Sequence, residues 1–231
     1  MSIYAQYGCG PSAGEGWLNF DASPTLRIER LPALGKIAGK LSTNSQPFPR
    51  EVRYGDIVKG LPLKDGSVAG LYASHVLEHL SFGDCRKALA NSLRVLRPGG
   101  IFRLIVPDLR ARAKAYVEAE GDPGAAHAFM RSTYLGRSDR SEGLTGRLRH
   151  AFGNSEHLWM YDFASMKSEL EAAGFAEIRR AEFGDCDDPM FQRVEKKDRF
   201  VSDGIDEVAI QACRPATARS KEIVEQPGMR D

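Results

Sequence analysis

Short apolar runs alternate along this chain with amphipathic patterns of helical period. This alternation predicts strands at residues 2–7, 17–20, 52–57, 68–73 and 101–106, and helices at 26–41, 84–96 and 163–173. We expect Asp84 and Asp162 to cap the second and third of these helices, Arg97 to Gly100 to end the second before its strand, and Gly174 to end the third. It is typical of a parallel sheet whose strands are joined and covered by helices. Two later runs, at residues 175–183 and 207–213, predict an antiparallel pair at the end of the sheet.

The length of 231 residues suits one α/β domain with an insertion. We expect a single domain over residues 1–213. Within it, residues 109–161 are rich in arginine and interrupted by glycine, so we expect them to form a helical cap that contacts the substrate. Residues 214–231 contain few apolar side chains and are expected to form a flexible tail.

Opposite charges nearly cancel, with 32 Lys and Arg against 31 Asp and Glu. A protein that binds nucleic acid mainly through phosphate contacts would show a basic excess. No run of apolar residues is long enough to span a membrane, and the first residues do not resemble a signal peptide. The four cysteines form no CxxC motif, which argues against a cysteine zinc site and fits a reducing cytoplasm. We expect a monomer or a homodimer.

Glycines and carboxylates stand where three of the predicted strands end. Gly8-Cys9-Gly10 follows the first strand, and Asp21 and Asp56 close the second and third. A ligand can approach backbone closely only where no Cβ intrudes, and a carboxylate at a strand end accepts hydrogen bonds from a ribose. The alternative for each is local: a tight turn at the glycines, and turn or helix capping at the carboxylates.

Five segments in order carry a resemblance to a known family. They are Gly8-Cys9-Gly10, Gly16 to Asp21, Leu61-Pro62 with Asp65, Ser74 to His79 (SHVLEH) and Arg97 to Gly100 (RPGG). Together they resemble class I S-adenosylmethionine-dependent methyltransferases with a type 11 domain. The resemblance implies a three-layer Rossmann-like α/β fold, with a mostly parallel seven-stranded sheet, that binds S-adenosylmethionine at the strand ends.

The resemblance also assigns the cofactor to residues of this chain, namely Gly8, Cys9, Gly10, Asp21, Asp56, Ile57, Ser74 and His75. By position, Asp21 takes the ribose hydroxyls. Asp56 and Ile57 hold the adenine, while Ser74 and His75 face the methionine and the reacting methyl group.

Two features depart from the family pattern. Only ten residues separate Gly10 from Asp21, which leaves no room for the helix that normally joins the first two strands. Either this connection is abbreviated or Asp21 is not the ribose ligand. In addition, Gln6 stands where many relatives place an acidic residue.

His75 to His79 also spells H-x-x-E-H, which on a helix places two imidazoles on one face, as in zinc metalloproteases. A buried strand directly before the motif argues against that arrangement. We therefore expect no metal, and a zinc hydrolase is the least favoured alternative.

Methyl transfer is an in-line displacement that depends mainly on holding nucleophile and methyl group in line, although an oxygen nucleophile benefits from a base. Candidate bases are His157, His150 and Asp108, with His75 beside them. We expect an S-adenosylmethionine-dependent enzyme that methylates a small molecule or glycan at oxygen. The main alternative is a non-catalytic binding subunit with the same fold. Arg147, Arg149 and His150 form a basic group, from which an anionic acceptor is a further hypothesis.

Overall fold

A computed structural model describes residues 2–30, 47–136 and 156–216. Its centre is a seven-stranded sheet in the order β3-β2-β1-β4-β5-β9-β6. The strands are β1 (Ile3–Tyr7), β2 (Leu18–Asp21), β3 (Val52–Tyr54), β4 (Val68–Ser74), β5 (Leu96–Val106), β6 (Ala176–Arg180) and β9 (Val208–Cys213). Only β9 runs against its neighbours β5 and β6, so the mostly parallel sheet and its terminal antiparallel pair are confirmed.

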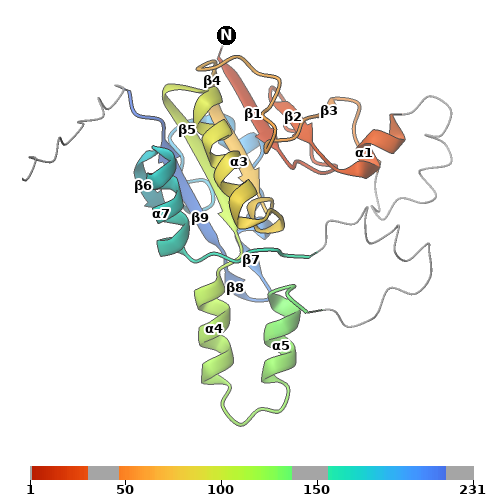
Figure 1. Ribbon diagram of the computed structural model, residues 1–231, viewed down its shortest axis with the longest axis vertical. Helices are drawn as coiled ribbons and strands as arrows, with labels where there is room; N and C mark the ends of the chain where they lie inside the picture. The colour runs from red at the N-terminus through yellow and green to blue at the C-terminus, as the bar shows by residue number, and fades with distance from the viewer. Residues whose placement is uncertain (1, 31–46, 137–155, 217–231) are drawn as a thin grey trace, which may run out of the picture.

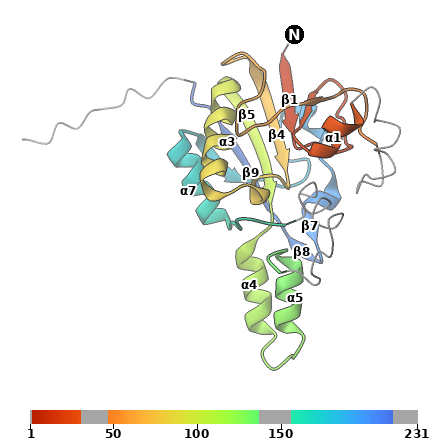
Figure 2. The same cartoon turned by 45° about the vertical axis from the view of Figure 1, so that its right-hand side comes forward.

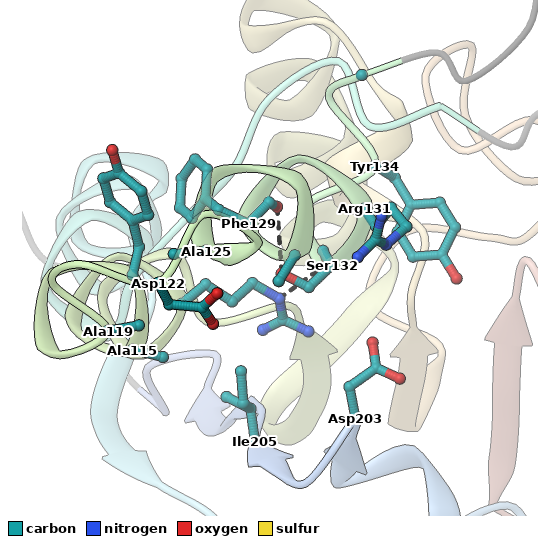
Figure 3. Close-up of a pocket in the computed structure, with 14 residues that line it drawn as sticks. Ala115, Ala119, Asp122, Ala125, Phe129, Arg131, Ser132, Tyr134, Asp203 and Ile205 are labelled. Carbon is teal, nitrogen blue, oxygen red and sulfur yellow. Dashed lines mark hydrogen bonds between the residues drawn. The ribbon is translucent and has the colours of Figure 1, made fainter.

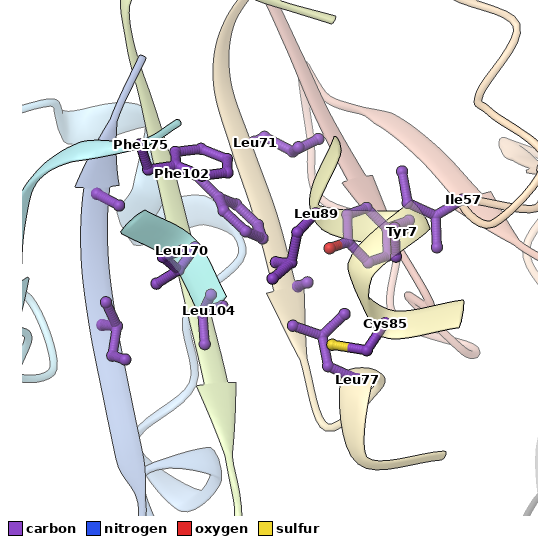
Figure 4. Packing of buried hydrophobic residues seen from close by; sticks show 14 of the residues in the cluster. Tyr7, Ile57, Leu71, Leu77, Cys85, Leu89, Phe102, Leu104, Leu170 and Phe175 are labelled. Carbon is purple, nitrogen blue, oxygen red and sulfur yellow. The ribbon is translucent and has the colours of Figure 1, made fainter. Parts of the chain in front are cut away.

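Helices α3 (Phe82–Val95) and α7 (Phe163–Ala173) cover one face of this sheet (Figure 1). Between helices and sheet lies the main apolar cluster, where Leu89 and Leu170 meet Phe102 and Leu104 of β5 (Figure 4). The side chain of Asp162 caps α7, as expected, and Gly174 ends it in a left-handed conformation.

The other face is covered by residues 181–200, which include the 3-10 helices η2 (Pro189–Arg193) and η3 (Lys197–Arg199). Phe191 packs there with Trp17, and both belong to a second buried cluster. The three layers that the resemblance implies are therefore present. One outer layer consists of this mostly irregular segment.

Several local boundaries differ from the sequence prediction, including the predicted strand at 52–57, which ends at Tyr54. Helix α3 begins after Ser81, whose hydroxyl accepts the amide hydrogen of Asp84, so the expected cap at Asp84 is wrong. The Arg97 to Gly100 segment does not separate helix from strand, because β5 already begins at Leu96. Helix α1 (Pro24–Glu29) covers the start of the helix expected at 26–41, and residues 31–46 of that prediction lie outside the described residues.

The first connection is abbreviated. Strands β1 and β2 pair in parallel although only residues 8–17 join them, and this loop contains no helix. Buried Gln6 donates to the Ser12 carbonyl oxygen and to Asn19 Oδ1, while Asn19 holds both backbone groups of Gly14. Two buried amide side chains thus hold a loop that replaces the usual helix.

Helices α4 (Leu109–Glu118) and α5 (Ala125–Ser132) form an antiparallel hairpin that projects from the end of β5 (Figures 1 and 2). Its base lies by the small sheet of β7 (Val201–Ser202) and β8 (Ile205–Asp206). The rest of the expected insertion, 137–155, lies outside the described residues.

Arg214, the first residue of the expected tail, is bound to the fold. The backbone of Arg214 pairs with Gly99 and Gly100, and its side chain donates to the carbonyl oxygens of Leu93, Arg94 and Leu96. Residues 217–231 lie outside the described residues. Within the described ranges, no helix combines the length and apolar character needed to cross a membrane.

Candidate functional site

A cavity of about 370 Å³ opens where β1, β2, β3 and β4 end. Its walls come from residues at the ends of these strands and in the segments just after them: Tyr7, Gly8, Asp21, Ala22, Ser23, Pro24, Gly55, Asp56, Ile57, Val58, His75, Val76, His79 and Leu80. The carboxyl ends of parallel strands meet at one edge of a sheet, which is where such sheets bind ligands. We call this the strand-end cavity.

The glycine turn contributes only in part to the strand-end cavity. Gly8 lines it with φ +63°, and a Cβ there would lie 2.3 Å from Val76 Cγ2, so packing inside the protein already requires glycine. Gly10 donates its amide hydrogen to Asp21 and is not part of the wall. Cys9 packs against the small cluster around Leu26.

Asp21 takes the local turn role that the sequence left open, and it also stands in the cavity wall. Its Oδ2 accepts the amide hydrogen of Gly10 at 2.9 Å, and its Oδ1 accepts that of Ser23 at 2.7 Å. The same buried carboxylate lines the strand-end cavity. Asp21 therefore holds the turns after β1 and β2 together while it faces the ligand space.

Asp56 is the second carboxylate of the cavity. Its Oδ1 accepts the amide hydrogen of Val58 at 3.0 Å, and Lys59 lies 3.3 Å from its Oδ2. Ile57 beside it is buried and lines the same wall. Because β2 and β3 are neighbours, the structure brings the two carboxylates to adjacent strand ends.

His75 lines the cavity in a strained left-handed conformation with φ +54°. Its Nε2 lies 3.0 Å from the carbonyl oxygen of Arg199, and its Nδ1 lies 3.4 Å from Glu78 Oε1. Burial opposes protonation, but the carboxylate of Glu78 outweighs it and raises the pKa of His75. Ser74, at the end of β4, does not line the cavity.

The helical arrangement that the H-x-x-E-H motif requires is absent. Residues Leu77–His79 form one 3-10 turn (η1), and the left-handed His75 precedes it. The two histidines therefore do not share the face of an α-helix, which removes the structural basis of the protease comparison.

Instead, His79 meets a histidine from a distant part of the chain. The rings of His79 and His157 lie 5.0 Å apart in a T-shaped arrangement, and Glu78 lies beside both. We call His75, Glu78, His79 and His157 the histidine cluster. Burial lowers the pKa of His157. Its ring also lies 5.0 Å from that of Tyr134.

The other two candidate bases do not join this cluster. Asp108 caps α4 by accepting the amide hydrogen of Ala111, and its own amide donates to Glu207. It does not line the strand-end cavity. His150, Arg147 and Arg149 lie outside the described residues.

A larger cavity of about 680 Å³ lies between the α4–α5 hairpin and the β7–β8 sheet. Figure 3 shows Phe129 and Ser132 of α5 across from Asp203 and Ile205. Tyr134 lines this hairpin cavity and contacts His157, which contacts His79 of the strand-end cavity. The histidine cluster thus lies between the two cavities. No motif in the sequence indicated Phe129 or Tyr134.

Residues 5–104 match the model of a family described as a methyltransferase domain. The chain contains a methyltransferase domain. Its matched residues run from β1 into β5. They include every wall residue of the strand-end cavity.

A curated relative of the methyltransferase domain is an uncharacterized 37.1 kDa protein in transposon TN4556 of Streptomyces fradiae. The two are 34% identical over 114 residues, which cover 49% of this chain and 32% of the relative. The alignment thus spans about a third of that protein's length.

Similar solved structures include an S-adenosylmethionine-dependent methyltransferase from Archaeoglobus fulgidus, with 15% identity and a TM-score of 0.46 over 92% of this chain and 86% of that one. A possible histamine N-methyltransferase from Thermotoga maritima has 16% identity and a TM-score of 0.44 over 93% and 82%. Both TM-scores are below 0.5, so these structures carry no argument about this chain, and its link to methyltransferases is the match of residues 5–104 to the family model.

The strand-end cavity of the methyltransferase domain fits S-adenosylmethionine. Asp21 and Asp56 supply acceptors for hydroxyl and amino groups, and Ile57 and Leu80 supply apolar surface for an aromatic base. Gln6 does not take over the role of the acidic residue that stands at this position in many relatives, because its side chain is turned away from the cavity and donates to the Ser12 carbonyl oxygen.

Proposed function

We propose that this protein transfers a methyl group from S-adenosylmethionine to an oxygen atom of a small molecule or glycan. The observation that carries the proposal is the pair Asp21 and Asp56, two carboxylates at adjacent strand ends facing one cavity inside the residues that match the methyltransferase family. The bound cofactor supplies an electrophilic methyl group.

The residues of this chain bind and orient. Asp21, already held by two backbone amides, accepts hydrogen bonds from the ribose hydroxyls without reorganising. Asp56 accepts from the exocyclic amine of the adenine, which lies against Ile57. His75 marks the end of β4 that faces the methionine part.

The acceptor is proposed to enter through the hairpin cavity. Its wall combines the aromatic rings of Tyr116, Phe129 and Tyr134 with a few polar groups, a lining typical of small-molecule sites. Arg112 is committed to Glu207, so Arg131 is the cation of this wall that stands exposed. The acceptor oxygen would then approach along the Tyr134–His157–His79 side, toward the strand-end cavity.

The first test is calorimetry with S-adenosylhomocysteine. Asp56→Ala should weaken binding by about 10- to 100-fold, because it removes a hydrogen bond to a charged acceptor worth about 1.5–3 kcal/mol. Asp187→Ala is the matched control, since Asp187 is exposed and lies outside the cavity wall. Equal affinity in both variants would contradict the assignment of the cavity.

A second candidate is a non-catalytic binding subunit, favoured by the abbreviated β1–β2 connection and by Gln6. Transfer of label from methyl-labelled cofactor to a panel of hydroxylated small molecules and glycans separates the two. Label in a product supports the enzyme, whereas tight cofactor binding without transfer to any acceptor favours the subunit. The four free thiols support placing this reaction in the reducing cytoplasm.

A further inference from the structure

Glu78 is buried, yet its carboxylate lacks donors. Its side chain is fully excluded from solvent, and neither oxygen has a hydrogen-bond partner among the described residues. The ring nitrogens of His75 and His79 lie 3.4 and 3.9 Å from Oε1, so protonated His75 forms a long ion pair with Glu78, but neither ring makes a hydrogen bond of ordinary length to it. A buried carboxylate without donors is costly unless a cation lies beside it.

The tautomer of His79 adds a second unpaired acceptor. Its Nδ1 lies 2.8 Å from the carbonyl oxygen of Glu156. Because a carbonyl oxygen only accepts, Nδ1 carries a proton, and in the tautomer with this single proton the lone pair of Nε2 points toward Glu78. Two acceptors therefore face each other across 3.9 Å, an arrangement that a metal ion between them would satisfy.

His157 brings a third donor atom from the segment before α7. One ligand atom each from Glu78, His79 and His157 lies within 4.8 Å of the other two. In a tetrahedral zinc site with bonds of about 2.1 Å, ligand atoms are about 3.4 Å apart. The three ligand atoms are thus slightly farther apart than in a site that holds zinc, and small side-chain rotations can bring them together.

We propose that Glu78, His79 and His157 bind a divalent transition metal ion of the zinc type. Two imidazoles and one carboxylate suit such an ion, and the hydrogen bond from His79 Nδ1 to a backbone carbonyl is the usual support for a ligating histidine. His79 also lines the strand-end cavity, which gives the ion a path to the buried carboxylate.

The site differs from the zinc motif that the sequence spells. His75 takes no part, and the third ligand comes from His157 instead. Three protein ligands leave one position for water. The ion would join η1 to the segment at 156–160, whose amides at Leu158 and Trp159 already donate to the Glu78 carbonyl oxygen. His157 then serves as a ligand rather than as a base.

The test is a zinc titration of full-length protein after removal of metal by a chelator. Calorimetry should show one zinc ion bound per chain, and Co²⁺ should give the visible absorption bands of a four- or five-coordinate site. His157→Ala and Glu78→Gln should each weaken zinc binding by at least about 100-fold, whereas exposed His127→Ala on α5 should not change it.

Absence of zinc binding to the wild-type protein would overturn the proposal, as would unchanged affinity in a folded His157→Ala variant. If His157→Ala fails to fold, Glu78→Gln and the Co²⁺ spectrum of the wild-type protein decide in the same way. The titration contains no S-adenosylhomocysteine, and the cofactor calorimetry uses metal-free protein. Failure of one proposal is therefore distinguishable from failure of the other.

Discussion

Glu78 and Glu207 are both buried carboxylates near the edge of the sheet that carries the strand-end cavity, but their surroundings differ. Glu207 receives two hydrogen bonds of 2.8 Å from the guanidinium of Arg112 and a third from the amide of Asp108. Glu78 receives none within the described part of the chain.

The difference separates a structural carboxylate from one that is prepared for a ligand. The bidentate pair of Arg112 and Glu207 ties the base of the hairpin to β9, and nothing further needs to bind there. Around Glu78 the neighbours are imidazoles held at distances that suit a bound cation better than hydrogen bonds. Three predictions test how far this comparison holds.

The largest effect is expected from Arg112→Met. It leaves the Glu207 carboxylate buried without its charged partner, which should lower the free energy of unfolding by about 3–5 kcal/mol. Urea denaturation measures the change. Arg110→Met is the matched control. Arg110 lies on the same helix as Arg112 and forms an exposed ion pair with Asp162, so its replacement should lower the free energy of unfolding by less than about 1 kcal/mol. Similar losses in both variants would contradict the special role of the buried pair.

An effect of opposite sign is expected from Glu78→Gln in metal-free protein. The neutral amide costs less to bury and can donate a hydrogen bond to His79 Nε2, so the free energy of unfolding should rise by about 1 kcal/mol. Urea denaturation with a chelator present measures it. Glu207→Gln should instead destabilise, because Arg112 keeps its charge. A loss of stability in Glu78→Gln would show that the carboxylate already has a partner.

The smallest effect is expected for Asp162→Asn, a change at a carboxylate paired with backbone. Asp162→Ala removes the N-cap of α7 and should cost about 1 kcal/mol, whereas Asn still caps and should cost only a few tenths.

The hydrogen bond from the Ser165 amide holds the pKa of Asp162 below its ordinary value. The contribution of the ionised Asp162 carboxylate to the free energy of unfolding is therefore fully present above the unfolded-state pKa, and it is lost as the pH falls through the folded-state pKa. The difference between wild type and Asp162→Asn should shrink below about pH 4. Thermal denaturation at several pH values would refute this if the difference stayed constant.

Local patterns carried most of the fold prediction. The strands, α7 with its cap and stop, and the antiparallel β6–β9 pair follow from runs of neighbouring residues whose period and boundaries are visible in sequence. The cap of α3 was misplaced because both Ser81 and Asp84 are good capping residues, and only backbone geometry distinguishes them. The parallel β1–β2 pair with so short a connection depends on Gln6 and Asn19, whose partners lie across the loop.

The residues of the candidate site likewise fall into those that local sequence predicted and those that only long-range contacts bring together. Asp21, Asp56 and Ile57 were predictable because each stands at or just after the end of a strand, and parallel strands bring their ends together. The need for glycine at position 8 comes from Val76, and the histidine cluster joins Glu78 and His79 to His157 far along the chain. Sequence by itself therefore determined which residues stand at the strand ends. Only the tertiary structure decided which side chains meet, because contacts between distant segments depend on how the layers pack and leave no periodic signal in the chain.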